Sequence, residues 1–406
     1  MTDFTGTQTW TYDDDGNVIN HVTTYTGLQA WTIGYTYNPD GSRLTMNTPA
    51  GGVGYSYDGV GRMSSLTDPG MTITTWTYLA NGWLASQKLG NGVVTNYNYN
   101  ARGFLTDMNN NANGGTLLSD FGSMTYDAVG NRTALTANIP AAPALAGATS
   151  YSYDTRNELL NETSARNGGY VNNFGYDGAE NPTTFKGAPN TFNADNQNAA
   201  YAFDGNGNPS TYKGVALSFD PENRLTSYGM VLTAGYDGDG LRAWKNTAAG
   251  KTYFVYDGDA PVLELDESGN VTAFNVWGAN GLLSRRTGTT SVYYTFDPQG
   301  SVVQRLDANQ NILSTSAYDA WGNPLVPNPN DPFGYEAQWG YYTDNETGLL
   351  ILTHRYYDPT QGRFVTRDPI RYAGGLNLYG YVGNEVIYGA DPFGLIVYSI
   401  GIGFIG

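Results

Sequence analysis

The sequence contains no cysteine, only two histidines and few charged residues. Without cysteine there is no disulfide framework, no thiolate nucleophile and no zinc–thiolate site. His21 and His354 are too few for a metal cluster or for a Ser-His-Asp arrangement, so we interpret both as strand residues. We therefore expect no metal and no cofactor.

Helix-forming residues and basic charge are also scarce. Charged residues make up 14% of the chain, against 53 glycines and 33 tyrosines, whereas long amphipathic helices need Ala, Leu, Glu and Lys. The net charge of −17 would repel nucleic acid and an anionic membrane surface, so nucleic-acid binding is not expected. The longest apolar run, residues 395–406, is too short and too rich in glycine to span a bilayer. The composition predicts an all-β protein.

A short aromatic motif repeats along most of the chain. Its copies include Tyr35-Thr-Tyr37-Asn38, Tyr55-Ser-Tyr57-Asp58, Tyr97-Asn-Tyr99-Asn100 and Tyr151-Ser-Tyr153-Asp154. From Tyr37 to Tyr99 the second aromatic recurs at intervals of 20, 21 and 21 residues. Because side chains alternate across a strand, both rings lie on one face, and the following Asp or Asn and Gly favour a tight turn. Each unit therefore predicts one β-hairpin.

Successive hairpins are expected to lie side by side as a ribbon whose tyrosines form ladders across neighbouring strands. Thr, Asn and Ser occupy both faces of these strands, so we predict a single-layer sheet with water on both faces. Residues 324–332 contain four prolines and cannot form a central strand, which indicates a boundary there.

The Asp- and Gly-rich turns between strands resemble ligand-binding loops only superficially. An EF-hand loop starting at Asp204 would need Gly and Glu where Pro209 and Val215 stand. Gly205-Asn-Gly207 lacks the helix and the Lys of a phosphate-binding loop. We interpret these segments as turns in which Asp bonds its own backbone.

The chain after residue 333 loses the repeat and carries an ordered series of other motifs. They are Asp344-Asn-Glu-Thr-Gly-Leu349, Arg355-Tyr-Tyr-Asp-Pro359, Gly362-Arg363-Phe364, Asp368-Pro369, Asn377-Leu-Tyr379, Asn384 and Asp391-Pro-Phe-Gly-Leu395. This series resembles the core-associated segment of YD-repeat (rearrangement-hotspot, RHS) proteins. That family includes shells of polymorphic toxins, insecticidal ABC toxin complexes and teneurins.

The resemblance implies a division of the chain into four parts. Residues 1–323 would form the YD-repeat β-shell, in which the hairpin ribbon winds into a single-layer, partly open shell. Residues 324–332 would be the proline-rich boundary. Residues 333–395 would form the RHS core segment, which closes the shell by folding against its inside or end. Residues 396–406 would be a short apolar tail in place of an effector domain.

The resemblance also implies a site of self-cleavage. Many members of the family cut their own chain after the Leu of Asp-Pro-x-Gly-Leu, which here is the Leu395–Ile396 bond. Asp368 and Asp391 would be the catalytic pair, because two carboxylates sharing a proton can activate water toward a peptide carbonyl. Arg363 and Arg367 are candidates to orient them. The alternative is that both Asp-Pro pairs only form turns.

Two departures from the family pattern weaken this hypothesis. Arg371 stands where self-cleaving relatives usually have Gly, and Asn384-Glu385 replaces their Asn-Asn-Pro. A cation beside Asp368 would hold it ionised, whereas the pair needs one protonated partner. We therefore expect weak or no cleavage, and a retained tail whose Ile and Phe side chains pack against the shell. No activity on outside substrates is expected.

The function that the resemblance implies is a bacterial shell scaffold that encapsulates and delivers a carboxy-terminal toxin effector, here without that effector. Its partners would be an effector or a companion shell chain. Two alternatives stay open: a secreted or surface module that binds glycans or cells, and an autoprotease acting in cis. Residues 1–10 carry no secretory signal, so we expect a cytoplasmic protein before export and an extracellular or cell-surface one afterwards.

Overall fold

Consecutive antiparallel hairpins make up most of the computed structural model, which describes residues 1–327 and 329–399. The first sheet contains β1 (Gly6–Tyr12), β2 (Val18–Tyr25), β3 (Ala30–Tyr37), β4 (Arg43–Thr48), β5 (Gly51–Tyr57), β6 (Met63–Thr67), β7 (Ile73–Tyr78), β8 (Leu84–Lys88), β9 (Val94–Tyr99), β10 (Leu105–Asn111), β11 (Leu117–Tyr126), β12 (Arg132–Asn138), β13 (Gly147–Tyr153), β14 (Leu159–Ser164) and β15 (Tyr170–Asn173). In this sheet every strand pairs with the next one along the chain.

The ribbon continues through a small sheet and then a second large one. The small sheet contains β16 (Gly175–Tyr176), β17 (Pro182–Phe185) and β18 (Ala188–Pro189). The second large sheet contains β19 (Thr211–Tyr212), β20 (Val215–Phe219), β21 (Leu225–Tyr228), β22 (Leu232–Tyr236), β23 (Arg242–Thr247), β24 (Gly250–Asp257), β25 (Ala260–Leu265), β26 (Val271–Gly278), β27 (Gly281–Thr287), β28 (Thr290–Phe296), β29 (Val302–Leu306) and β30 (Ile312–Thr315).

The rest of the described chain consists of short strands and single helical turns. These are β31 (Tyr342–Asp344), β32 (Leu349–Leu352), β33 (Arg355–Asp358), β34 (Arg363–Phe364), β35 (Gly389–Ala390) and β36 (Tyr398–Ser399), and the 3-10 turns η1 (Pro143–Leu145), η2 (Arg166–Gly168), η3 (Ala337–Trp339), η4 (Arg371–Ala373) and η5 (Val382–Asn384). In residues 1–327 and 329–399 no helix is long and apolar enough to cross a membrane.

The repeated tyrosine joins each hairpin to the one before it. The hydroxyl of Tyr78, at the end of β7, donates to the Met63 carbonyl oxygen over 2.8 Å, and Tyr99 makes the same bond to Leu84 over 3.0 Å. Equivalent bonds start from Tyr37, Tyr57, Tyr126, Tyr153, Tyr176, Tyr236 and Tyr256. The repeat therefore conserves a hydroxyl as well as an aromatic ring along the ribbon.

In many repeats an Asp follows the aromatic residue and closes the turn. Oδ1 of Asp58 accepts backbone N–H bonds from Val60 and Arg62, both of 3.0 Å. Gly61 has φ 87°, a left-handed conformation that favours glycine. Asp204 accepts bonds from its own turn in the same way, so its carboxylate has a structural partner.

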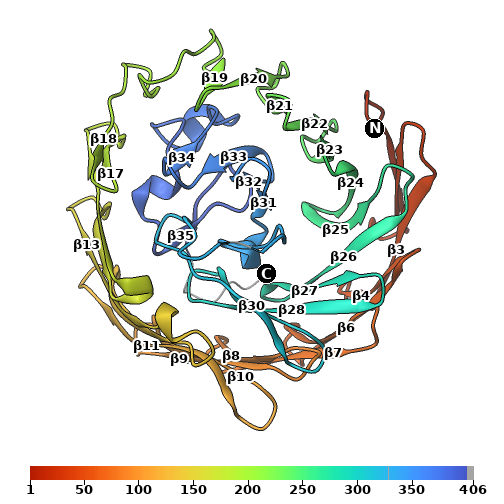
Figure 1. Cartoon of the computed structure of the whole chain (residues 1–406). Coiled ribbons are helices and arrows are strands. Elements are labelled where there is room, and N and C mark those ends of the chain that lie inside the picture. Colours follow the sequence, from red (N-terminus) through yellow and green to blue (C-terminus); the bar gives the residue numbers. More distant parts are fainter. Residues whose placement is uncertain (328, 400–406) are drawn as a thin grey trace.

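The ribbon winds as a spiral, and its second turn lies inside its first (Figure 1). Strands β24–β30 face the inner side of the early strands, and the β1–β2 hairpin meets the β22–β23 turn through a 2.7 Å bond from Gln8 to Asp237. The Tyr25 and Tyr253 rings lie 5.0 Å apart across this overlap, and Arg43 pairs with Asp257. The all-β hairpin ribbon agrees with the sequence prediction, and where the second turn overlaps the first the wall is two sheets thick.

The second turn is buried on both faces because it lies between two cores. Adjacent residues such as Phe254 and Val255 belong to different clusters of buried apolar side chains. Leu282 and Leu283 divide in the same way. A strand buried on both faces carries continuous apolar residues rather than an alternating pattern. The early repeats lack such continuous apolar runs, and their polar residues alone therefore predicted a single layer.

The segment after the proline-rich stretch lies inside the spiral (Figure 1). Strands β31–β34 form a sheet of their own. The buried Asp344, in β31, accepts bonds from Arg242 over 2.5 Å and from Lys245 over 3.0 Å, both in β23. These charge-assisted bonds join the inner segment to the ribbon, in agreement with the expectation that it folds against the inside of the shell.

Candidate functional site

Asp391 holds the backbone on both sides of Leu395. It follows β35 and begins a turn in which the Gly394 N–H donates to the Asp391 carbonyl oxygen over 3.1 Å. Its side-chain Oδ1 accepts the N–H of Leu395 over 2.8 Å and the N–H of Ile396 over 3.1 Å. The amide nitrogen of the Leu395–Ile396 bond is therefore fixed directly beside a buried carboxylate.

Asp368 approaches the other end of the same peptide bond. The approach is visible at Gly374, where a Cβ would lie 2.9 Å from the Leu395 carbonyl oxygen and would collide with the Asp368 carboxylate. The backbone of Asp368 is fixed by a 2.8 Å bond from its N–H to the Leu378 carbonyl oxygen. The structure thus brings together Asp368, Asp391 and the predicted cleavage bond.

Arg355, the first residue of β33, joins the two carboxylates. Its Nη2 lies 2.9 Å from Asp368 and 3.5 Å from Asp391, and its Nε donates to the Gly394 carbonyl oxygen. The guanidinium carbon lies 3.6 Å from the centre of the Phe364 ring. Sequence reasoning missed this residue, although it begins the Arg355-Tyr-Tyr-Asp-Pro359 motif.

Burial sets the proton affinity of the three groups. It raises the pKa of Asp391 to about 6, against the opposing effects of Arg355 and of the Leu395 and Ile396 N–H groups. Burial also raises the pKa of Asp368, again opposed by Arg355. It lowers the pKa of Arg355 to about 10, although both carboxylates favour its charged form. One carboxyl can therefore stay protonated close to neutral pH.

Arg363 and Arg367 are engaged elsewhere. Arg363 donates to the Asn196 carbonyl oxygen over 2.6 Å and stacks on Phe192. Arg367 lies against Gly207 and bonds to Tyr379. Among the described interactions neither arginine contacts Asp368 or Asp391, and the cation that lies beside both carboxylates is Arg355.

Arg371 is not the cation beside Asp368 that the sequence predicted. Its side chain is exposed at the start of η4, and the cation that acts on Asp368 is Arg355. The tail differs too, because Ile396 and Val397 are 54% and 44% exposed rather than packed against the shell. The predicted packing of Phe404 lies outside the described residues.

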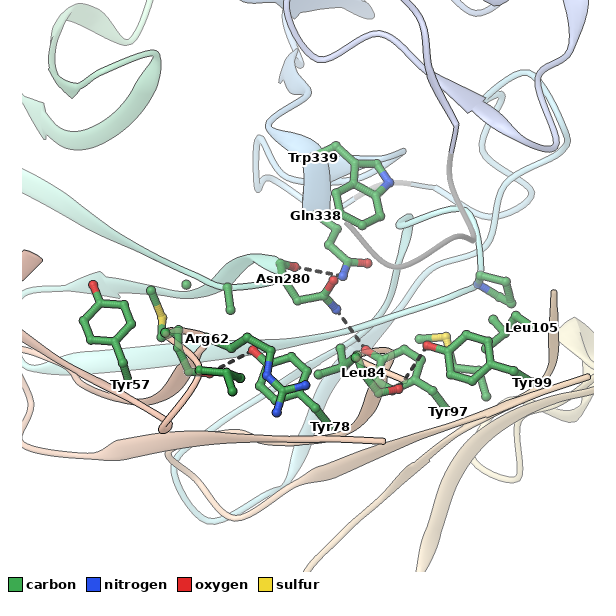
Figure 2. A pocket seen from close by; sticks show the side chains of 18 of the residues that line it. Tyr57, Arg62, Tyr78, Leu84, Tyr97, Tyr99, Leu105, Asn280, Gln338 and Trp339 are labelled. Atoms are coloured by element: carbon green, nitrogen blue, oxygen red, sulfur yellow. Dashed lines mark hydrogen bonds between the residues drawn. The ribbon is translucent and has the colours of Figure 1, made fainter. Parts of the chain in front are cut away.

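A second concave region opens between the two turns of the spiral. This cavity of about 500 Å³ is bounded by the tyrosine ladder on one side and by the turns after β26 and β28 on the other (Figure 2). Its lining residues include Tyr57, Tyr78, Tyr99, Asn280, Gln338 and Trp339. Asn280 donates to the Tyr97 hydroxyl over 3.0 Å, and Gln338 donates to the Asn280 carbonyl oxygen over 2.9 Å.

In residues 1–327 and 329–399 no group of His, Cys, Asp or Glu has an arrangement that could hold a metal ion.

The chain is similar in sequence to parts of much longer known proteins. The chain is 33% identical over 174 residues to the tRNA3(Ser)-specific nuclease WapA of Bacillus spizizenii, a match of 41% of this chain and 8% of that protein. It is 31% identical over 165 residues to the double-stranded DNA deaminase toxin A of Burkholderia cenocepacia, a match of 39% of this chain and 11% of that protein. The matched regions are therefore small parts of these relatives.

A solved structure has the same fold. The Tc holotoxin pore of Photorhabdus luminescens, carrying a TccC3 mutation, superposes over 96% of this chain and 23% of its own with a TM-score of 0.75 and 20% identity. The family model of the teneurin YD-shell matches residues 1–135 and 122–387. The hairpin ribbon and strands β31–β34 fall within the family match, which ends at residue 387. The chain belongs to the teneurin YD-shell family of YD-repeat proteins.

Proposed function

We propose that the protein is a shell scaffold that encloses the polypeptide continuing from its carboxy-terminal side. The observation that carries this is the position of β36, which pairs with β35 among the strands inside the spiral (Figure 1). A chain that continues from β36 starts inside the shell.

The relatives support a carrier rather than an enzyme of outside substrates. One is named a tRNA nuclease and another a DNA deaminase toxin, yet both share with this chain the same kind of YD-repeat region. Since the two activities differ, the shared region is the part that does not determine them. A toxin effector is therefore the class of cargo we propose.

A test polypeptide fused to either end distinguishes an enclosing shell from a simple scaffold. The fusion carries the Asp391→Asn substitution so that the chain stays intact. An unstructured, trypsin-sensitive polypeptide fused after Gly406 is expected to be digested much more slowly than the same polypeptide fused before Met1, where β1 lies at the outer turn. Equal digestion rates would overturn the proposal.

We further propose that the shell cuts itself at the Leu395–Ile396 bond. The supporting observation is that Asp391 binds the amide N–H of this bond while Asp368 approaches its carbonyl oxygen. This differs from the expectation of weak cleavage, because the Arg371 side chain is exposed, and burial raises the pKa of Asp391 to about 6 even with Arg355 beside it.

The chemistry requires one water and one shared proton. Asp368, ionised beside Arg355, takes a proton from water as the water oxygen bonds to the Leu395 carbonyl carbon, and protonated Asp391 donates to the carbonyl oxygen. The C–N bond then breaks, Asp368 passes its proton to the Ile396 nitrogen, and Asp391 recovers its own. The products are a Leu395 carboxyl group and an Ile396 amine. Intact-mass spectrometry should show that the wild type loses residues 396–406 and that Asp391→Asn retains them.

A further inference from the structure

A buried chain of hydroxyl groups leads from Asp391 to Glu336. The backbone N–H of Asp391 donates to the Tyr341 hydroxyl over 2.7 Å. The Tyr341 and Tyr381 hydroxyls lie 2.8 Å apart, and the Tyr381 hydroxyl donates to Oε2 of Glu336 over 3.2 Å. If Tyr341 donates to Tyr381, every donor in the chain points toward Glu336, and hydrogen bonds aligned in this way reinforce one another.

Glu336 is an unusual residue for its position. It is completely buried, its Oε1 has no hydrogen-bond partner among the described residues, and its backbone is left-handed with φ 46°. A residue with a Cβ rarely adopts this conformation, and a buried carboxylate without a cation is costly. Such features persist where the surroundings fix them, and they concentrate at functional sites.

Burial keeps this carboxyl neutral. It raises the pKa of Glu336 well above its usual range, and Asp297 adds to the effect, while the nearby hydroxyl groups of Tyr335, Tyr341 and Tyr381 oppose it. A neutral carboxyl group accepts the Tyr381 bond without placing a net negative charge near Asp391. An amide has the same shape and the same acceptor.

We propose that Glu336, Tyr381 and Tyr341 are positioning residues for cleavage of the Leu395–Ile396 bond, acting through the backbone N–H of Asp391. The inference rests on the self-cleavage proposed above. It goes further by assigning the support of Asp391 to three side chains that touch neither the Leu395–Ile396 bond nor its two carboxylates. Their hydrogen bonds fix where the Asp391 turn begins, and Oδ1 of Asp391 meets Ile396 only if that turn is in place.

The test compares first-order cleavage rates of full-length variants. Tyr341→Phe and Glu336→Leu are expected to slow cleavage roughly tenfold to hundredfold, because small misplacements of a catalytic group have effects of this size. Glu336→Gln keeps the acceptor and should restore nearly the wild-type rate. Tyr357→Phe is the matched control: it removes a buried hydroxyl that bonds to Trp321, from a ring 4.1 Å from that of Tyr381.

Two further readouts separate positioning from loss of structure. The midpoint of the pH–rate profile should be the same in Tyr341→Phe as in the wild type, since the chain of hydroxyl groups moves no proton in the reaction. In an Asp368→Asn background, which cannot cleave, the Asp391 amide should exchange with solvent faster in Tyr341→Phe and Glu336→Leu than in Tyr357→Phe.

Several outcomes would overturn the inference. One is that Tyr341→Phe and Glu336→Leu cleave as fast as Tyr357→Phe, and another is that Glu336→Gln is as slow as Glu336→Leu. If the wild type does not cleave at all, the proposed self-cleavage fails and the chain of hydroxyl groups has no catalytic role. The hydrogen-exchange measurement then still decides whether the chain of hydroxyl groups holds the Asp391 amide. Failure of the proposed self-cleavage and failure of this inference are therefore distinguishable.

Discussion

The backbone N–H of Ile396 donates a 3.1 Å hydrogen bond to Oδ1 of Asp391, so a peptide nitrogen and a buried carboxylate face each other. This bond and the neighbouring one from Leu395 give the Asp391-Pro turn a role beyond reversing the chain. The turn presents one particular peptide bond to two carboxyl groups, and Arg355 holds those groups together.

The close approach at Gly374 gives the first prediction. An added methyl group would collide with Asp368 and crowd the Leu395 carbonyl oxygen, so Gly374→Ala should slow cleavage by about tenfold or more. The backbone conformation of Gly374, with φ −87°, suits alanine, which leaves steric contact as the cause. Gly205→Ala is the control, because a Cβ there meets no atom within 4 Å. Equal rates for the two variants would show that the Gly374 region is not part of the site.

The pH dependence of cleavage follows from the shared proton. The pKa of Asp391 is raised to about 6, so the pair loses its last proton as the pH rises through that value. The rate should therefore fall about tenfold per pH unit above pH 6. Incubation of freshly purified uncut protein at a series of pH values, followed by quantification of the shorter species, measures it. A rate that rises between pH 6 and pH 8 would contradict the shared-proton mechanism.

The buried ion pair between Asp344 and Arg242 gives a stability prediction. Asp344→Ala leaves the buried Arg242 without its carboxylate and Lys245 with Glu346 alone, and breaking such a buried pair costs about 3–5 kcal/mol of unfolding free energy. Urea unfolding followed by tryptophan fluorescence measures this loss. Glu267→Ala, at an exposed turn, is the control and should change stability little. Similar midpoints for both variants would mean that the inner segment is not fixed to the ribbon through Asp344.

The tyrosine ladder predicts a smaller and more local effect. Tyr78→Phe keeps the ring but removes the bond to the Met63 carbonyl oxygen, and should lower the unfolding free energy by about 1 kcal/mol. Tyr372→Phe, whose ring is 71% exposed, should leave it unchanged. If Tyr78→Phe is equally neutral, the hydroxyl bonds between hairpins contribute nothing measurable to the ribbon.

The hairpin ribbon could be predicted because its information is local. A Tyr, one residue, a second Tyr and an Asp fix a strand end and a turn within a few positions, and the 20–21-residue interval repeats that unit. The overlap of the two turns could not be predicted in this way, because it depends on the curvature of the whole ribbon. One signal was present: runs such as Val302-Val303 and Leu282-Leu283 put apolar residues on both faces of late strands.

The candidate site could also be predicted only in part. The motifs identified Asp368, Asp391 and the Leu395–Ile396 bond, and the structure brings these together. Arg363 and Arg367 were the predicted orienting residues, but they lie against Asn196 and Tyr379 instead. The cation comes from β33, whose return to this site depends on tertiary folding.

Intact-mass spectrometry of the purified protein tests the central claim most directly. The account predicts a species that ends at Leu395, together with its complete disappearance in separate Asp391→Asn and Asp368→Asn variants. The Arg363→Lys variant should cleave like the wild type, because Arg363 contacts neither carboxylate in the described structure. A wild-type protein that retains residues 396–406 after prolonged incubation near pH 5–6 would contradict the account.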